Sequence, residues 1–441
     1  MATKLVQGPH SLRNRLLIAA GALAALVAGV LAAERPGSAD AAASTGYSVV
    51  IISGDGMGPA QRTATQLAKY GYKTQPMDAL PEGGLLKTNS ILPVTDSAAG
   101  ATAMGTGHKV NNNQAGLAPN GKKLYNLVEE ARDLGKSTGL VEDHDVTNAT
   151  MMGFAAHVKN RDNKAQAARQ YLNETHPDVI FGGGEEVWYP EGHPGKLPDV
   201  ISDDESTGRE NLVEKAIDQG YQYAWNRKTF DELTGPQALA LVQDDAYIRG
   251  HEIKGYRKDK DPHFVPEPVL MEKALEILGQ NPEGFFIAAD VDELDDAGHE
   301  HDGKSVIQSG QIVNKMVQVV QEYRETTNPN VLLIVTADHE TGGMTVEMPA
   351  STSTNSGPDG EVPAYGTPQN VPLPGGKTPK RSGPFKVKGK DAKFKVDWTT
   401  PGHTGLMVPV TAAGPAAERF SGVHPNTFVH EVASDVLNGN P

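Results

Sequence analysis

Short apolar runs alternate with amphipathic segments along the chain from residue 47 onward. The apolar runs are too short for helices and predict buried strands, whereas the amphipathic segments have the periodicity of helices. The predicted strands are residues 47–53, 137–141, 179–181, 284–289 and 332–336. The predicted helices are residues 59–70, 124–134, 268–278 and 306–324.

This alternation predicts an α/β fold with a mainly parallel central sheet flanked by helices on both faces. A simple length rule would divide the 441 residues into about three domains. The candidate functional residues run from Asp55 to His403, however, so they span any such division. We therefore predict a single catalytic domain over residues 44–441, with insertions at the active-site edge.

Two segments have the composition of insertions into this domain. Residues 185–264 are polar and carry clusters of charge, and they predict a small helical subdomain around residues 210–235. Residues 349–395 are rich in Gly, Pro, Ser, Thr and Lys, which predicts a surface excursion with little core.

The N-terminus has the layout of a signal peptide. Basic residues at Lys4, Arg13 and Arg15 precede an uncharged stretch over residues 16–33, and small residues dominate residues 38–44. We predict a signal peptide over residues 1–43, export to the periplasm or medium, and no stable membrane association after cleavage. The alternative is an uncleaved anchor, since the apolar stretch is near the minimum length for a membrane span.

Charge and cysteine content narrow the functional classes. The formal net charge of −15 argues against nucleic acid or an anionic membrane as a partner. The chain contains no cysteine, so it forms no disulfide and has no thiol nucleophile. Stability then depends on the core and on bound metals.

Metal-ligand side chains follow three of the predicted strands. Asp55 follows the first, Asp290 follows the 284–289 strand, and Asp338 and His339 follow the 332–336 strand. In open α/β sheets ligands bind at the carboxyl ends of the strands. One carboxylate at a strand end is ordinary, but three such ends predict one polynuclear metal site.

A second ligand pair lies shortly after Asp290. Asp295 and His299 are four residues apart, which places both on the same face of a helical turn. The same spacing also occurs at a solvent-exposed helix start, so the pair alone does not distinguish a metal site from an ordinary helix N-terminus. His403, in a turn between glycines, is a candidate third ligand because this pair lacks one.

The ligand types suggest which ions these residues would hold. Asp55, Asp338 and His339 make a second set of mixed Asp and His, and such sets without cysteine suit Zn²⁺ with an open position. Thr150 and Asp290 offer only oxygen and suit Mg²⁺, which could share Asp55.

Ser97 and Arg161 are the candidate catalytic residues. Ser97 begins a small-residue, helix-compatible tract, so its hydroxyl lies near a helix N-terminus that favours an oxyanion. A plain N-cap serine is the alternative. Arg161 offers a fork that can hold two phosphate oxygens, although an isolated arginine is more often on the surface.

The motifs around these candidate residues resemble those of the alkaline phosphatase family. The specific matches are residues 54–58, 95–103, 336–343 and 402–404, in the family's order and across nearly the whole chain after residue 44. Weaker matches are residues 148–150, 157–161 and 290–299.

The resemblance implies a hydrolase of phosphate monoesters in which Ser97 is the nucleophile that forms a phosphoserine. Arg161 would hold the non-bridging oxygens of the phosphate. The resemblance also implies two zinc ions and one magnesium ion, and a homodimer is plausible. The implied ligands are Asp295, His299 and His403 for the zinc that activates water, Asp55, Asp338 and His339 for the zinc that activates Ser97, and Asp55, Thr150 and Asp290 for magnesium.

Three residues depart from the family pattern. Asn148 replaces an acidic residue or His near the third ion, and Asp290 replaces a longer Glu. Asp296 stands where relatives often have Lys, His or Trp, so it adds negative charge near the phosphate and should weaken product binding. The alternatives are a related phosphodiesterase, a phosphatase dedicated to one metabolite, or a metal-binding protein without turnover; a sulfatase is disfavoured because cysteine is absent.

Overall fold

The computed structural model describes residues 46–196, 208–242, 263–349 and 382–441. The predicted signal peptide over residues 1–43 lies outside these ranges. Residues 43–441 form one compact unit. Among the helices in the described ranges, none is both long and apolar enough to cross a membrane.

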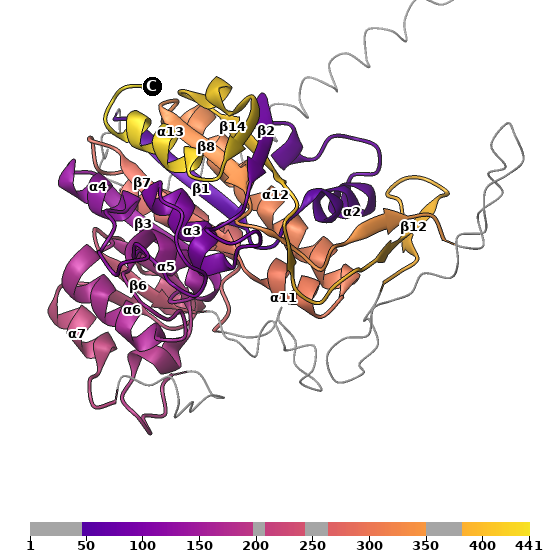
Figure 1. Cartoon of the computed structure of the whole chain (residues 1–441). Helices are drawn as coiled ribbons and strands as arrows, with labels where there is room; N and C mark the ends of the chain where they lie inside the picture. The colour runs from indigo at the N-terminus through magenta and orange to yellow at the C-terminus, as the bar shows by residue number, and fades with distance from the viewer. Residues whose placement is uncertain (1–45, 197–207, 243–262, 350–381) are drawn as a thin grey trace, which may run out of the picture. The chain divides into compact units, whose positions relative to one another are not determined.

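A ten-stranded sheet forms the centre of this unit (Figure 1). Only β14 runs antiparallel to its neighbours among these strands, which confirms the predicted mainly parallel sheet. In spatial order the strands are β15 (Gly422–Pro425), β2 (Glu82–Lys87), β14 (Val408–Ala413), β8 (Val331–Thr336), β1 (Ser48–Gly54), β7 (Phe285–Val291), β3 (Ser137–Asp145), β4 (Val179–Gly183), β6 (Ala238–Leu241) and β5 (Gln222–Ala224).

Helices cover both faces of the sheet, as predicted. On one face α12 (Gly303–Thr326) packs on β1, β7 and β8, and α10 (Glu267–Leu278) packs on β3 and β4. On the other face α4 (Leu127–Asp133), α5 (Ala149–Ala155) and α13 (Phe428–Leu437) contact β1, β3 or β7. The remaining helices of the two layers are α2 (Pro59–Lys69), α3 (Ser97–Thr106), α6 (Lys164–Gln170) and α11 (Glu293–His299).

Strand register brings the polar strand ends together. Ser53 at the end of β1 pairs with Asp290 on β7 and with Thr336 on β8. Glu142 on β3 also pairs with Asp290. Every residue of β1, β7 and β8 is buried, which explains why these strands read as continuous apolar runs. The carboxyl ends of four neighbouring strands therefore meet at one edge.

The first predicted insertion is partly wrong. Helices α7 (Leu212–Asp218) and α8 (Arg227–Asp231) lie in the predicted helical subdomain. The same segment also supplies β5 and β6, which extend the central sheet beyond β4. All four residues of β6 are buried, so the short run Ala238–Leu241 is core sequence within a polar segment.

The second predicted insertion has more core than its composition indicated. Strands β10 (Thr345–Glu347), β12 (Lys393–Asp397) and β11 (Phe385–Lys386) form a small antiparallel sheet. Val387 and Phe394 of this segment are buried in a second apolar cluster, together with Val396 and Trp398 just after it and Ala64 of α2. The prediction of little core is therefore wrong for residues 382–395, and residues 350–381 lie outside the described ranges.

Two element boundaries shift for local reasons. The helix predicted from residue 124 begins at Leu127, because Asn126 caps it and forms a capping box with Glu129. Strand β3 continues past the predicted end to Asp145 through buried polar residues. The shorter elements are η1 (Pro76–Asp78), η2 (Tyr171–Thr175), η3 (Glu185–Trp188), β9 (Glu340–Thr341), β13 (His403–Thr404) and η8 (Ala417–Phe420).

Candidate active site

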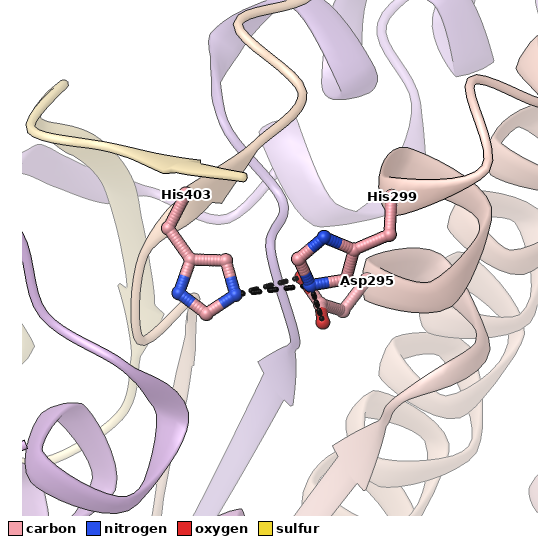
Figure 2. Close-up of side chains that lie close together, drawn as sticks. All are labelled: Asp295, His299 and His403. Carbon is pink, nitrogen blue, oxygen red and sulfur yellow. Dashed lines mark hydrogen bonds and ion pairs between the residues drawn. The ribbon is translucent and has the colours of Figure 1, made fainter. Parts of the chain in front are cut away.

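Asp295, His299 and His403 converge as the sequence predicted (Figure 2). Asp295 and His299 come from one face of α11, and Asp295 Oδ2 lies 3.0 Å from His299 Nε2. His403 comes from β13, and its Nε2 lies 3.1 Å from His299 Nε2. The three ligand atoms lie within 4.8 Å of one another, which is close enough to share one ion.

Backbone carbonyls orient the two imidazoles of this first set. His299 Nδ1 lies 2.6 Å from the carbonyl oxygen of Pro401, and His403 Nδ1 lies 3.1 Å from that of Thr95. A carbonyl oxygen only accepts, so each Nδ1 donates its proton, and in the neutral ring the lone pair is then on the Nε2 that faces the centre. The set therefore has the tautomers that metal ligation needs.

Asp55, Asp338 and His339 form the second set, and all three side chains are fully buried. His339 Nε2 lies 3.1 Å from Asp338 Oδ2 and 3.4 Å from Asp55 Oδ1. Neither carboxylate oxygen accepts a hydrogen bond within the described part of the chain. Buried carboxylate oxygens without donors are costly unless a cation compensates them, so these residues fit a metal ion.

Burial shifts the pKa values of several groups in the two sets. Burial raises the pKa of Asp55, and it raises that of Asp338 to about 6, with repulsion from neighbouring carboxylates adding to both. Burial lowers the pKa of His339, which keeps its imidazole neutral. Burial opposes ionisation of Asp295, but contact with His299 holds its pKa below the usual range.

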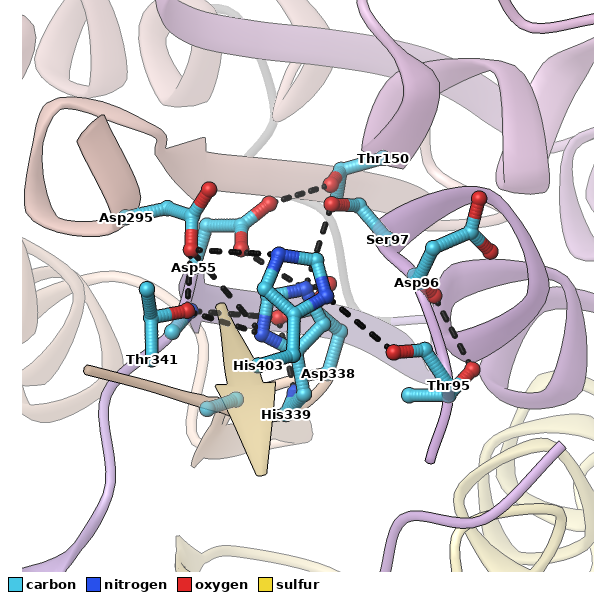
Figure 3. Close-up of polar contacts among 12 residues, drawn as sticks. Asp55, Thr95, Asp96, Ser97, Thr150, Asp295, Asp338, His339, Thr341 and His403 are labelled. Carbon is cyan, nitrogen blue, oxygen red and sulfur yellow. Dashed lines mark hydrogen bonds and ion pairs between the residues drawn. The ribbon is translucent and has the colours of Figure 1, made fainter. Parts of the chain in front are cut away.

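Ser97 is not the cap of its helix, so the plain N-cap alternative is wrong. Asp96 is the N-cap of α3 and accepts a hydrogen bond from the backbone N–H of Ala99 at 3.0 Å. Ser97 is the first helical residue, and its Oγ lies 3.2 Å from His339 Nε2 (Figure 3). The hydroxyl thus faces the second ligand set at a helix N-terminus.

Arg161 lies beside this hydroxyl. Its Nη1 is 3.4 Å from Ser97 Oγ and 3.8 Å from Asp96 Oδ2. Its backbone N–H donates to the carbonyl of Asn113 at 3.0 Å, which holds the loop in place. The side chain is 27% exposed, so the guanidinium is anchored yet open to a ligand arriving at Ser97.

The set that offers only oxygen ligands, Asp55, Thr150 and Asp290, also includes Asp292 in the structure. Thr150 Oγ1 donates to Asp55 Oδ2 at 2.9 Å, and Asp290 is fully buried on β7. Ligand oxygens of Asp55, Asp290 and Asp292 lie within 4.8 Å of one another. The sequence reading missed Asp292, although it lies two residues after Asp290 at the same strand end.

Thr341 was also missed, and it contacts both of the ligand sets that contain histidine (Figure 3). Its hydroxyl donates to Asp295 Oδ1 and lies 3.2 Å from His339 Nδ1. It comes only two residues after His339, so its proximity to that ligand was the available signal. We infer that Thr341 orients one ligand of each set.

We expect Thr341→Val to weaken zinc retention by roughly 10–100-fold, because outer-shell partners of metal ligands contribute about that much. Competition with a chelator, followed by zinc analysis, measures the effect. Thr345→Val is the matched control, since the Thr345 hydroxyl contacts only Glu347 among the hydrogen bonds found for it. Equal zinc retention in both variants would show that Thr341 does not support the ligands.

Comparison with known proteins gives a consistent result. The sequence profile of the alkaline phosphatase family matches residues 47–438. Alkaline phosphatase 4 of Bacillus subtilis (strain 168) is 28% identical over 433 residues, covering 88% of each chain. Streptomycin-6-phosphate phosphatase of Streptomyces griseus is 28% identical over 462 residues, covering 92% of each chain. The cold-active alkaline phosphatase from the psychrophile Shewanella sp. matches with a TM-score of 0.68 and 26% identity, over 88% of this chain and 99% of that one.

Proposed function

The chain belongs to the alkaline phosphatase family and is a phosphoric monoester hydrolase, and we propose that it is exported and works through a phosphoserine at Ser97. The observation that carries the proposal is the position of the Ser97 hydroxyl. It lies between His339 of a buried ligand set and the Arg161 guanidinium, 3.2 and 3.4 Å away respectively.

The proposed cofactors are two zinc ions and one magnesium ion. Asp295, His299 and His403 would hold one zinc, and Asp55, Asp338 and His339 the other. Thr150 and Asp290 would hold magnesium together with Asp55. When bound, such ions stabilise negative charge on the attacking and leaving oxygens of an in-line displacement.

The chain's own residues bind and orient the phosphate. Arg161 would hold two non-bridging oxygens through its planar fork. The N-terminus of α3 contributes backbone N–H groups and a favourable dipole at Ser97. The Ser97 oxygen would attack phosphorus first and displace the alcohol. Water would then attack phosphorus of the phosphoserine and displace the Ser97 oxygen, and each attack would come from the side opposite to the leaving group. Because each displacement inverts phosphorus, the overall reaction would retain its configuration.

Arg161→Lys tests the phosphate clamp. Lysine keeps the charge but loses the bidentate fork, so we expect kcat/KM for p-nitrophenyl phosphate to fall by roughly 10–100-fold, mainly through KM, as loss of a charged hydrogen bond of about 1.5–3 kcal/mol implies. Inhibition by inorganic phosphate should weaken in parallel. Arg169→Lys, whose guanidinium pairs with Glu210 instead, is the matched control. An unchanged KM and phosphate inhibition in Arg161→Lys would contradict the role.

A phosphatase dedicated to one metabolite is the second candidate. It is favoured by the similarity to streptomycin-6-phosphate phosphatase, which is as close in identity as Alkaline phosphatase 4. Comparing kcat/KM across sugar, nucleotide and aryl monoesters, with a diester as a negative control, separates the two. A broad enzyme would differ by less than about 10-fold among monoesters, whereas a dedicated one would favour one class far more strongly.

Export and oligomeric state are proposed on separate grounds. The N-terminal layout supports cleavage near Ala41 or Ala43, and N-terminal sequencing of the protein recovered outside the cytoplasm tests it. A homodimer is proposed from the family resemblance alone, and sedimentation equilibrium tests it. An intact N-terminus in a membrane fraction would overturn the export proposal.

A further inference from the structure

Helix α11 carries a second pair of acidic ligands on an adjacent face. Asp292 is its N-cap and Asp296 lies four residues later, so both side chains lie on the same side of one turn. Asp295 and His299 have the same spacing three residues further on, which rotates them by about 60° around the helix axis. One short helix thus presents ligand pairs in two directions.

The second pair meets a histidine from a different element. His144 lies near the end of β3, and ligand atoms of His144, Asp292 and Asp296 lie within 4.8 Å of one another. His144 and Asp292 are buried, and Asp296 is half-buried. The backbone N–H of Asp292 donates to Asp143 Oδ1 at 2.7 Å, which fixes the end of β3 to the start of α11. The geometry of this cluster is therefore set by two anchored elements.

A further buried carboxyl group, that of Glu142, lies two residues before His144 on β3. Glu142 is fully buried and pairs in register with Asp290 across β3 and β7. Its Oε2 accepts no hydrogen bond within the described part of the chain. Glu142 and Asp290 lie directly opposite each other in the sheet, and like charges in that position repel. A cation held by the neighbouring His144, Asp292 and Asp296 would offset this repulsion at a buried carboxyl oxygen that has no donor.

We propose that His144, Asp292 and Asp296 form a fourth divalent-cation site next to the oxygen-only set. Asp292 also belongs to the group with Asp55 and Asp290, so its two oxygens can serve neighbouring ions. One imidazole and two carboxylates suit a transition-metal dication such as Mn²⁺ or Zn²⁺ better than Mg²⁺. The inference rests on the proposed function for the identity of the other three ions.

The test is a metal count on the purified full-length protein. The protein is loaded with Zn²⁺, Mg²⁺ and Mn²⁺, freed of excess ions by gel filtration, and analysed by plasma mass spectrometry and Mn²⁺ electron paramagnetic resonance. We expect four tightly held divalent ions per chain in the wild type and three in His144→Gln. Affinity for the fourth ion should fall by more than the roughly 10–100-fold that outer-shell changes cause.

Two further variants make the outcome decisive. Asp296→Asn removes a ligand from a half-buried position and should also hold three ions, in case His144→Gln fails to fold. His424→Gln, whose imidazole contacts Ser421 and Phe428, should keep four. A wild-type count of three, or a count of four in Asp296→Asn, would overturn the fourth site. Failure of the proposed function would show separately, as fewer than two zinc ions or no hydrolysis of p-nitrophenyl phosphate by the wild type.

Discussion

Ser97→Ala is expected to lower kcat for p-nitrophenyl phosphate by roughly 10⁴–10⁶-fold, the range seen when a covalent nucleophile is removed. The physical reason is that the Ser97 oxygen is the proposed attacking atom, and alanine has no atom to replace it. The sequence contains no cysteine, and the Ser97 hydroxyl faces both His339 and Arg161. Steady-state assays on the fully metallated variant measure the loss.

The control for this experiment is Ser309→Ala. Ser309 is as buried as Ser97, but its hydroxyl donates to the carbonyl of Ser305 within α12, away from the ligand sets. It should keep wild-type kcat, and both variants should hold the wild-type amount of zinc. A Ser97→Ala enzyme within about 10-fold of wild type would mean that water attacks the ester directly.

Removing the metals is expected to abolish turnover and to make folding stability fall as pH rises from 6.5 to 8. Burial raises the pKa of Asp292 to about 8 from an ordinary value of 3.8. Burial lowers the pKa of His299, but contact with the Asp295 carboxylate outweighs burial and raises this pKa from 6.5 to about 9. Both groups therefore bind protons more tightly in the folded chain than in the unfolded chain throughout this interval.

The direction follows from proton linkage. Where the folded state binds more protons than the unfolded state, the free energy of unfolding decreases as pH rises. Asp292 alone implies a loss of about 1–2 kcal/mol between pH 6.5 and 8. Asp55, whose pKa burial also raises, acts in the same direction. The pKa of His339 is lowered from 6.5, so this group opposes the trend, because the unfolded chain still binds part of a proton there near pH 6.5. The opposing contribution is less than about 0.5 kcal/mol, since an ordinary imidazole is already half neutral at pH 6.5.

Urea unfolding in EDTA at the two pH values measures this effect. Adding back Zn²⁺ and Mg²⁺ should restore activity and reverse the trend, because ligands must be deprotonated to bind metal and binding is therefore stronger at higher pH. Metal-free protein that is equally or more stable at pH 8 would contradict the assignment of these buried groups as a cation site.

Ligands that closely follow an apolar run were easier to predict from the sequence than ligands in loops or turns. Asp55, Asp338 and His339 come at the ends of fully buried strands, and strand ends in a parallel sheet converge regardless of loop detail. His403 required more, because its place beside His299 depends on a two-stranded pairing of β13 with β9. Only its glycine-flanked turn and the missing third ligand suggested it.

Other features were hidden because polar residues carry core roles. The sequence predicted a strand that ends at Val141, yet Glu142, Asp143 and His144 are buried and continue it. Buried charge cannot be distinguished from a solvated segment by periodicity alone. Strand β6 was hidden for a related reason, since its short apolar run lies within a polar stretch. Both cases lie where neighbouring strands, rather than local sequence, decide burial.

The central claim is a reaction of two successive displacements through Ser97. Its most direct test is the stereochemistry of phosphoryl transfer, with a monoester made chiral at phosphorus by oxygen isotopes and an alcohol as acceptor. Two inversions predict that the product retains the configuration of the substrate. Inversion at phosphorus would require a single direct displacement and would contradict the phosphoserine mechanism.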